Sequence, residues 1–340
     1  MDKSKESKKL ASIERIRDLE EIQNADFLLK AKILGWQVII RKDDEFQEGD
    51  LCVYVRVDSV LPEKEEFNFL KSKNYRIRPI KLRGVLSQGI AFKLDILPAA
   101  IQNEAKEGMD VTDVIGVKHY EKPIPVRLDG EFLGNFPHQI PKSDEIRIQA
   151  VPNVLKRHQG TPVYISEKLD GTSATFFLLN DEFGVCSRNK QLVRDQENSF
   201  WSIAIKNNIE EKLRNIGKNL AIQGELVGKG INRNNYDLPG HEIYIFSIYD
   251  IDKSTYFEYE DLVSLIHKLD LKGVPIIDKD LLLDHSINDL ENLAEGKSLI
   301  NLNIPREGIV VRSMAETSDH EIGHLSFKVI NPEYELNYED

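Results

Sequence analysis

The segment covering residues 163–171 constrains the fold most, because an alternating apolar run leads directly into a lysine and a turn. Residues 163–165 read Val-Tyr-Ile, which is the β-branched and aromatic composition of a strand. Lys168 follows, and Asp170-Gly171 then supplies a carboxylate and a tight turn. A lysine so placed can act as a covalent nucleophile when its surroundings lower its pKa. The same pattern also fits an exposed β-turn with a solvated lysine, so the segment needs support from elsewhere in the chain.

Further polar segments follow Lys168 in order, and most of them adjoin a strand-like run. They are Ser187-Arg188-Asn189, Gly224-Glu225-Leu226, Phe246 to Asp250, Glu307-Gly308-Ile309-Val310-Val311 and Phe327-Lys328. Together with the lysine segment they resemble the six collinear motifs of the covalent nucleotidyltransferases, which include ATP- and NAD-dependent ligases and mRNA capping enzymes. Residues 142–149 and 228–234 resemble RNA ligases in particular.

The resemblance implies that the amine of Lys168 attacks the α-phosphorus of ATP, which requires the uncharged form. At an ordinary lysine pKa near 10.4, only about one part in 10³ is uncharged at neutral pH. Burial and a nearby divalent cation favour the uncharged amine, whereas carboxylates alone would raise its pKa. We therefore expect Mg²⁺ or Mn²⁺ at this site, held through water molecules by Asp170, Glu225 and Glu307.

The resemblance assigns the remaining nucleotide contacts to residues of the other motifs. Phe246 is expected to stack on adenine, although a phenylalanine in a strand also fits an ordinary core position. Arg147 and Arg188 suit the ribose and phosphate oxygens, because guanidinium donors match pairs of oxygens. Glu167 is expected in the same nucleotide pocket, and Lys328 is expected to neutralise the α-phosphate during transfer.

The last motif departs from the pattern of many relatives, which carry two lysines spaced Lys-x-Lys. The earlier position here is Ser326. Either Lys328 acts alone, or a cation from elsewhere in the sequence substitutes. The candidates are Lys190, Lys229 and Arg312.

The length of 340 residues fits two domains. Residues 116–140 are rich in glycine and proline with little periodicity, and they predict a linker between a domain at 1–115 and one at 141–340. The first domain is expected to begin with a short helix from Leu10 to Leu19. Short β-like runs follow at 27–29, 36–40, 51–55, 77–82 and 89–92, with a turn at Gly49-Asp50, and predict a small barrel.

Residues 24–36, 49–50 and 82–89 resemble the OB-fold tRNA-binding modules, and also the OB domain that precedes the catalytic domain in Deinococcus-type RNA ligases. DNA ligases and capping enzymes normally carry their OB domain after the last motif, where this sequence has only a dozen residues. The expected fold class is therefore α+β: an N-terminal OB-fold β-barrel, followed by a mixed α/β nucleotidyltransferase domain with ATP-grasp-like antiparallel sheets.

A basic strip without any acidic residue extends from residue 71 to residue 93. Such a strip on a small barrel predicts contact with a phosphate backbone, although lysines also protect exposed strand edges. Its expected nucleic-acid contacts are Lys71, Lys73, Arg76, Arg78, Lys81 and Arg83. The net charge of −12 predicts that binding is modest and sensitive to salt.

Several other classes are disfavoured by the sequence. No stretch is long and apolar enough for a membrane span, and no Cys/His cluster has zinc spacing. Cys52 and Cys186 lie in expected strands, which indicates buried free thiols and an intracellular protein, cytoplasmic or nuclear. The acidic region 258–295 is expected to be a helical packing element, and the protein is expected to be a monomer.

These observations predict an ATP-dependent RNA ligase that seals a 3′-hydroxyl to a 5′-phosphate through a lysyl-AMP intermediate. The expected substrate is RNA or a nicked duplex whose 3′-hydroxyl strand is RNA. A DNA ligase or a capping-type guanylyltransferase is the alternative enzyme. A tRNA-binding protein with an inactive nucleotidyltransferase domain is the alternative from another class.

Overall fold

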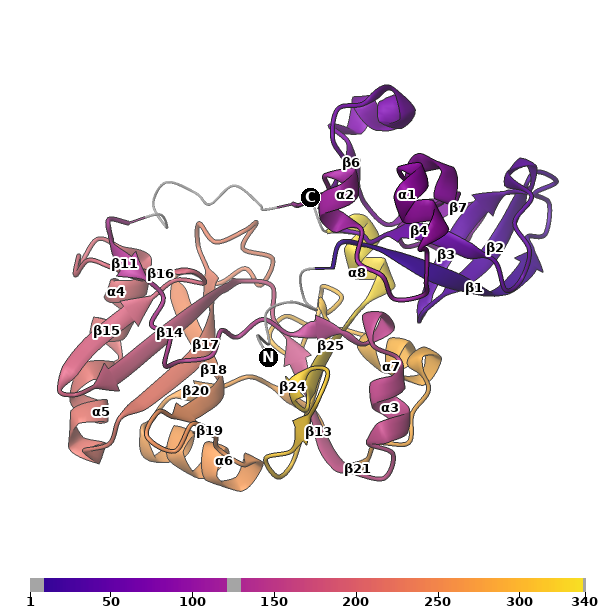
Figure 1. Cartoon of the computed structure of the whole chain (residues 1–340). Helices are drawn as coiled ribbons and strands as arrows, with labels where there is room; N and C mark the ends of the chain where they lie inside the picture. Colours follow the sequence, from indigo (N-terminus) through magenta and orange to yellow (C-terminus); the bar gives the residue numbers. More distant parts are fainter. Residues whose placement is uncertain (1–8, 121–129, 339–340) are drawn as a thin grey trace. The chain divides into compact units, whose positions relative to one another are not determined.

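The computed structural model describes residues 9–120 and 130–338, which fall into two compact units (Figure 1). The first unit comprises Met1–Lys122, Arg147–Lys156 and Glu335–Asp340, and the second comprises Pro123–Ile146 and Arg157–Tyr334. Residues 121–129 of the expected linker lie outside the described part of the chain. Each unit is built on its own antiparallel sheets.

A five-stranded sheet in the order β3-β2-β1-β4-β9 forms the core of the first unit. The strands alternate inward and outward side chains, so that Trp36, Val38 and Ile40 of β3 are buried while their neighbours are partly exposed. This accounts for the β-like runs of the sequence. The elements are β1 (Ala11–Glu21), β2 (Leu28–Ile33), β3 (Trp36–Arg41), β4 (Leu51–Val55), β5 (Ser59–Val60), β6 (Arg76–Ile77), β7 (Ile80–Leu82), β8 (Val85–Ser87), β9 (Ile90–Phe92), β10 (Lys118–His119), α1 (Ala99–Asn103), α2 (Thr112–Ile115) and 3-10 helices at Lys42–Asp44, Glu65–Lys73, Leu94–Ile96 and Ile148–Ala150.

The expected helix from Leu10 to Leu19 is wrong, because this segment is the central strand β1. Ile13 and Ile16 lie three residues apart, a spacing typical of a helix, and both are fully buried. In the ladder with β2, Ile16 pairs with Ile33 and Asp18 with Lys32, so Arg17 is an extra residue in a bulge. Pairing on both sides of β1 overrides the local helical pattern.

The second unit contains an eight-stranded sheet, with β11-β16-β15-β14-β17-β18-β19 in line and β20 beside β18, and a five-stranded sheet in the order β12-β25-β22-β13-β21. Strand β18 pairs antiparallel with β17 and β19 but parallel with β20. The elements of this unit are β11 (Phe132–Asn135), β13 (Pro162–Lys168), β14 (Thr172–Leu179), β15 (Glu182–Cys186), β16 (Lys190–Leu192), β17 (Leu220–Gly228), β18 (His241–Asp250), β19 (Thr255–Tyr256), β20 (Lys272–Gly273), β21 (Ile276–Leu282), β22 (Gly308–Ser313), β23 (Ser318–Asp319), β24 (Gly323–His324), β25 (Ser326–Ile330), α4 (Ser199–Lys206), α5 (Ile209–Ile216), α6 (Tyr259–Lys268) and α7 (Ile287–Ala294). Three further elements include residues of both units: β12 (Ile146–Arg147), α3 (Asn153–Arg157) and α8 (Pro332–Asn337).

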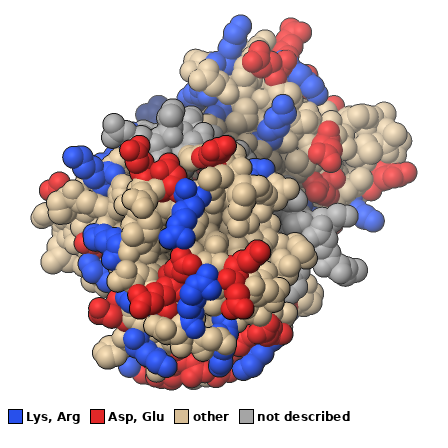
Figure 2. Space-filling model, turned by 90° about the vertical axis from the view of Figure 1, so that its left-hand side faces the viewer, with Lys and Arg blue, Asp and Glu red and all other residues tan. Residues whose placement is uncertain are grey.

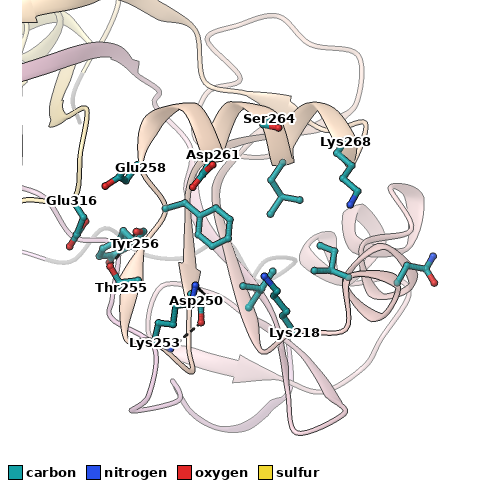
Figure 3. A pocket seen from close by; sticks show the side chains of 15 residues that line it. Lys218, Asp250, Lys253, Thr255, Tyr256, Glu258, Asp261, Ser264, Lys268 and Glu316 are labelled. Carbon is teal, nitrogen blue, oxygen red and sulfur yellow. Dashed lines mark hydrogen bonds and ion pairs between the residues drawn. The ribbon is translucent and has the colours of Figure 1, made fainter.

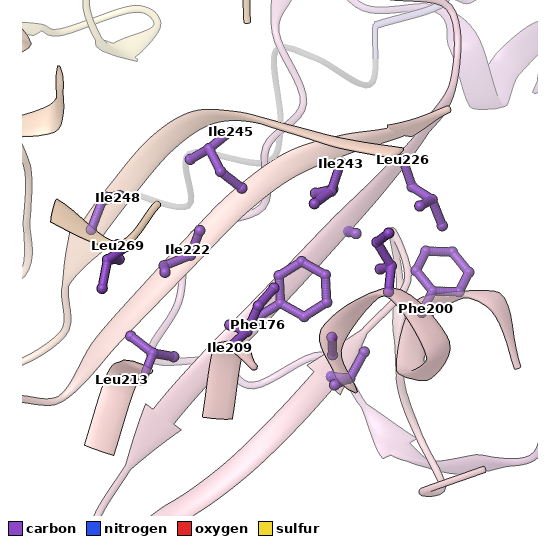
Figure 4. Close-up of a cluster of buried hydrophobic side chains, with 14 of the residues drawn as sticks. Phe176, Phe200, Ile209, Leu213, Ile222, Leu226, Ile243, Ile245, Ile248 and Leu269 are labelled. Atoms are coloured by element: carbon purple, nitrogen blue, oxygen red, sulfur yellow. The ribbon is translucent and has the colours of Figure 1, made fainter. Parts of the chain in front are cut away.

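One face of the eight-stranded sheet is covered by helices and forms the main apolar core (Figure 4). Phe176, Ile222 and Ile245 project from β14, β17 and β18 toward Phe200 of α4 and Leu213 of α5. Because side chains alternate along a strand, the residues between them face the other way. That second face carries Ser173, Gln223 and Glu225, which the register places side by side or two apart. These polar positions are the part of the face available for chemistry, whereas Phe177, Ala221 and Tyr249 of the same face belong to a buried apolar cluster.

The acidic region 258–295 is only partly helical. It begins with α6 and ends with α7, but β21 lies between them and pairs with β13. The expectation of a helical element is therefore wrong in the middle of this region, where a strand extends the five-stranded sheet. Cys52 and Cys186 are buried and free, as expected.

Candidate active site

Lys168 is the last residue of β13, and its side chain meets Glu307 at the start of the neighbouring strand. The distance from Lys168 Nζ to Glu307 Oε1 is 2.5 Å. The register pairs Lys168 with Gly308, so Glu307 directly precedes the residue opposite Lys168. A Cβ at Gly308 would run into the carbonyl oxygen of Val329, so only glycine permits this close approach of β22 and β25.

Three carboxylates act on the Lys168 amine, and they belong to the three predicted acidic residues. Burial lowers the pKa of Lys168, but Glu307, Glu225 and Asp170 together raise it above its ordinary value. The amine is therefore protonated in the protein without a nucleotide. Burial also raises the pKa of Glu225 to about 8, although the charge of Lys168 opposes that shift. The site thus holds more carboxylate than its own cation can neutralise.

The turn after Lys168 is held tightly against strand β17. A Cβ on Gly171 would collide with the Leu226 carbonyl oxygen and would come within 2.9 Å of the Glu225 side chain. Glycine at this position therefore lets the Asp170 turn approach the strand that carries Glu225. The Asp-Gly pair of the motif has a steric reason in addition to its turn preference.

The carboxylate of Asp170 accepts hydrogen bonds on both oxygens. Asn232 Nδ2 donates to Oδ1 at 2.6 Å, and Asn235 Nδ2 and the Tyr334 hydroxyl donate to Oδ2 at 2.9 and 2.6 Å. The Asp170 backbone N–H donates to the Tyr236 hydroxyl at 2.6 Å. The sequence analysis missed Asn235 and Tyr334 as functional candidates. Their only signal was the RNA-ligase-like run that ends at residue 234, one position before Asn235.

Lys328 and Arg312 share the sheet face of Lys168. The antiparallel ladders pair Lys328 with Val310 and Arg312 with Ser326, and opposite residues project to the same side. Val310 is paired with Ser166, two residues before Lys168. Among the candidates to replace the missing lysine, Arg312 is therefore the one that lies directly opposite position 326.

Phe246 is the extra residue of a β-bulge in β18. Gln223 pairs with Ser247 and Gly224 pairs with Ile245, so Phe246 has no partner on β17. A bulge re-aims the side chain that it contains. The ring of Phe246 is partly exposed, and the guanidinium carbon of Arg312 lies 5.4 Å from its centroid. Stacking of adenine on Phe246 remains a prediction. A phenylalanine that only fills the core of a strand, however, would not need to lie in a bulge.

The segment 141–145, which precedes β12, contacts residues in or next to several motifs. Each of five successive residues from 141 to 145 makes a hydrogen bond or ion pair with a different residue near the site. The pairs are Pro141 O with Gln223 Nε2 (2.8 Å), Lys142 with Asn189 (2.7 Å), Ser143 with Ser173 (2.6 Å), Asp144 with Arg188 (2.7 Å) and Glu145 with Arg312 (2.8 Å). Arg188 is more than half exposed despite its pair, so its guanidinium is accessible to a ligand.

Arg147 was expected to contact ribose or phosphate oxygens, but its guanidinium is engaged elsewhere. It belongs to the first unit, where its guanidinium binds Glu335 at 2.5 Å and Asp58 at 3.1 Å. The Glu335 side chain is fully buried, and only 11% of the Arg147 side chain is exposed. The structure therefore assigns Arg147 to a buried ion-pair network rather than to an open nucleotide contact.

The basic strip is mostly exposed, with one exception. Lys71, Lys73, Arg78, Lys81 and Arg83 are exposed, and the last two lie on the β7–β8 hairpin. Arg76 is buried, its guanidinium carbon lies 3.5 Å from the centroid of the Tyr120 ring, and it pairs with Asp58 at 3.8 Å. The expectation that Arg76 contacts a phosphate backbone is therefore corrected to a structural role.

The distribution of charged side chains does not by itself identify a binding site. In the view of Figure 2, basic and acidic side chains of the described residues are intermingled. A separate cavity of about 560 Å³ lies beside α6 and the end of β18 (Figure 3). Its lining includes Lys218, Asp250, Asp261 and Lys268 but none of the predicted catalytic residues. This cavity is therefore separate from the predicted site around Lys168.

The acidic residues fit a metal held through water better than a metal held directly. Within 9–120 and 130–338, no group of three or more His, Cys, Asp or Glu side chains is placed to coordinate an ion. Asp170 already accepts three hydrogen bonds, which limits direct coordination. Mg²⁺ usually keeps several of its waters in proteins. The water-mediated ion at Asp170, Glu225 and Glu307 stays a prediction.

In the part of the chain that the structure describes, no helix is long and apolar enough to cross a bilayer.

Comparison with known proteins agrees with both units. The RNA ligase family model matches residues 161–330, and an OB-fold domain model matches residues 10–94. No curated protein sequence matches the chain. Solved structures do, and these include variants and complexes of Naegleria gruberi RNA ligase. A glutamate-to-alanine variant with ATP and Mn has a TM-score of 0.90 and 34% identity, covering 98% of this chain and 100% of that one.

A lysine-to-alanine variant with ATP and Mn has a TM-score of 0.89 and 35% identity, covering 96% of this chain and 98% of that one. The complex of that ligase with PPi has a TM-score of 0.88 and 35% identity, covering 96% of this chain and 97% of that one. The expected α+β fold, an N-terminal OB fold followed by an α/β catalytic domain, is confirmed. The chain belongs to the RNA ligase family.

Proposed function

We propose that this protein is an ATP-dependent RNA ligase of the Deinococcus-type branch that works through a lysyl-AMP intermediate. The observation that carries the proposal is the position of Lys168 among Glu307, Glu225 and Asp170, three acidic residues of separate motifs. The order of an OB-fold domain before the catalytic domain supports the branch. The domain limits that we propose are 1–115 and 141–340.

Lys168 Nζ forms a bond to the α-phosphorus of ATP, and the bond from that phosphorus to the pyrophosphate oxygen breaks. AMP then passes to the 5′-phosphate of the substrate, and a 3′-hydroxyl displaces AMP to form the phosphodiester. Lys328, on the same sheet face as Lys168, is placed to offset charge on the transferred phosphate. Phe246 supports adenine and Arg188 binds ribose or phosphate oxygens.

The Lys168–Glu307 ion pair favours the protonated amine before substrate binds, and a protonated amine is no nucleophile. A divalent ion, Mg²⁺ or Mn²⁺, held through water by Asp170, Glu225 and Glu307, would supply positive charge that lowers the pKa of this amine and offsets charge on the phosphates. Glu167, which the resemblance places in the nucleotide pocket, is buried, and its Oε2 accepts the Leu299 N–H at 2.7 Å. We propose that it fixes the end of β13 rather than contacting the nucleotide.

The OB-fold domain is proposed to bind the nucleic acid through the exposed members of the basic strip. We favour a nicked duplex with RNA on the 3′-hydroxyl side as substrate. The alternatives predict different outcomes. A DNA ligase would seal regardless of the sugar at the 3′-hydroxyl, a guanylyltransferase would be labelled by GTP, and a binding protein would form no adduct.

The decisive test is labelling of the purified protein with α-labelled ATP and Mg²⁺ or Mn²⁺. Wild type is expected to form a covalent adduct, and Lys168→Ala is expected to form none. Lys106→Ala is the matched control, because Lys106 is an exposed lysine that lies outside the motifs and outside the basic strip. Equal labelling of wild type and Lys168→Ala would disprove the nucleophile, and labelling by GTP or NAD in place of ATP would disprove the nucleotide.

A further inference from the structure

The hydrogen bonds around Asp170 form a closed triangle. Asn235 Nδ2 donates to Asp170 Oδ2 at 2.9 Å and also to the Tyr334 hydroxyl oxygen at 2.7 Å. That hydroxyl in turn donates to Asp170 Oδ2 at 2.6 Å. Each member therefore contacts the other two, and such networks fix geometry more firmly than isolated bonds.

The second carboxylate oxygen is fixed by the same loop. Asn232 donates from Nδ2 to Asp170 Oδ1 at 2.6 Å and to the Gly171 carbonyl oxygen at 3.2 Å. Asn232 has a φ of +46°, a left-handed conformation that asparagine tolerates better than most residues. The loop is in turn anchored from a distant segment, because Asn301 Nδ2 donates to the Asn235 carbonyl oxygen at 3.3 Å.

The donors from Asn232, Asn235 and Tyr334 are all neutral, which determines how they affect the Asp170 carboxylate. A cationic partner would cancel the charge of Asp170 and compete with both Lys168 and a divalent ion. Amide and hydroxyl donors fix the orientation of the carboxylate while its charge remains available. The packing agrees, since Tyr334 is buried and Asp170 lies at the edge of the site with part of its surface accessible.

We propose that Asn232, Asn235 and Tyr334 are positioning residues that hold the Asp170 carboxylate at the angle needed to accept from the water shell of the divalent ion. The inference rests on the proposed function for the role of the ion. The hydrogen-bonded unit itself, Asn232–Asn235–Tyr334–Asp170, is a property of the protein without ligands.

The first test therefore uses no nucleotide and no metal. The free energy of unfolding in guanidinium is measured for wild type, Tyr334→Phe, Asp170→Ala and the double variant. This double-mutant cycle gives the coupling free energy between Tyr334 and Asp170. Tyr334→Phe is expected to lower the folding equilibrium constant about tenfold in the wild-type background and far less in the Asp170→Ala background, because the hydroxyl has then lost its acceptor. Equal effects in both backgrounds would overturn the proposed unit. This result does not depend on whether the protein is a ligase.

The second test measures lysine adenylylation as the concentration of Mn²⁺ is raised. Tyr334→Phe and Asn235→Ala are expected to raise the half-saturating Mn²⁺ concentration about tenfold, with a smaller change in the rate at saturation. Asn234→Ala is the matched control: it lies in the same loop, but its side chain bonds Leu238 rather than Asp170. A merely structural role would lower the folded fraction and leave the half-saturating concentration unchanged.

The outcomes separate the two proposals. If wild type forms no adduct with any nucleotide while the unfolding cycle shows coupling, the proposed function fails and the hydrogen-bonded unit stands. If wild type is labelled but neither variant shifts the Mn²⁺ dependence, the positioning role fails and the ligase chemistry stands.

Discussion

Arg312 on β22 lies directly opposite Ser326 on β25, at the position where many relatives carry a lysine. Its side chain is almost fully buried and its Nη2 bonds Glu145 at 2.8 Å. Burial lowers the pKa of this guanidinium, but Glu145 and neighbouring groups raise it overall, so the charge is retained. The missing lysine is thus matched by a permanent cation on the facing strand.

We predict that Arg312 supplies the second positive charge of the site. Arg312→Met should slow lysine adenylylation at saturating ATP by about 10²-fold, the size typical of a lost electrostatic contact in a transition state. Adding Ser326→Lys to that variant should restore part of the rate. Single-turnover labelling measures both effects.

Removing Arg312 also leaves Glu145 without its cation, which destabilises the fold. The double variant Glu145→Gln/Arg312→Met removes both charges and separates stability from catalysis. Lys190→Met and Lys229→Met are the controls for the other candidate cations. A large rate loss in either control, with Arg312→Met unaffected, would refute the assignment.

The raised pKa of Glu225 has a consequence for stability in the nucleotide-free, metal-free protein. Between the pKa of the unfolded chain, about 4.3, and the folded value of about 8, the folded state holds a proton that the unfolded chain has released. Stability therefore falls as the pH rises through this window. Glu225→Gln should remove that slope and should be more stable than wild type at pH 8.

Chemical unfolding at pH 5, 6.5 and 8 measures this effect. Glu182→Gln, an exposed glutamate on β15, is the matched control and should keep the slope of wild type. A steeper decline with pH in Glu225→Gln than in wild type would contradict the cause assigned here.

The motif residues could be predicted from the sequence because six short segments, in order, resemble those of a known family, although each segment alone is a weak signal. Lys168, Glu225 and Lys328 lie on or at the ends of alternating strands, and pairing of those strands brings them together. The acidic trio around the amine was predicted in the same way. Nothing local in the sequence, however, indicated the bulge that re-aims Phe246.

Arg147 and Arg76 could not be placed from the sequence, because their partners are distant along the chain. Asp58 approaches both of them, and Glu335 lies 188 residues from Arg147. An arginine near a motif looks the same in the sequence whether it faces solvent or a buried carboxylate. Tyr334 was missed for a related reason: its hydroxyl meets Asp170 across 164 residues.

Asp319 forms a second charged centre, whose role is predicted to be stability. It accepts from Arg157 at 2.9 and 3.0 Å, and its Oδ2 lies 2.8 Å from His158 Nε2. Burial raises its pKa, but the bonds to Arg157, His158 and the backbone of Glu321 and Ile322 outweigh it, so the pKa is lowered.

A lowered pKa stabilises the fold above the unfolded value near 3.9 and loses that effect as the pH falls below it. Asp319→Asn should therefore cost about 2 kcal/mol or more at pH 6, with the difference from wild type shrinking below pH 4. Unfolding curves across pH 2–6 measure it. Asp252→Asn, which alters an exposed hydrogen bond to Asn219, is the control. A constant difference at every pH would show that the ion pairs are not the cause.

The basic strip predicts separable effects on RNA binding and on folding. Lys81 and Arg83 are exposed on one hairpin, so alanine at either position should weaken RNA binding. Each lost phosphate contact should lower the slope of log K against log salt by about 0.7 to 0.9.

Arg76→Ala should leave that slope unchanged, because the Arg76 guanidinium is buried, stacks on Tyr120 and pairs with Asp58. It should instead lower the free energy of unfolding by about 1–3 kcal/mol. Titration of labelled RNA at several salt concentrations, with unfolding curves for each variant, distinguishes the two roles. A reduced salt slope in Arg76→Ala would mean that its guanidinium reaches the backbone after all.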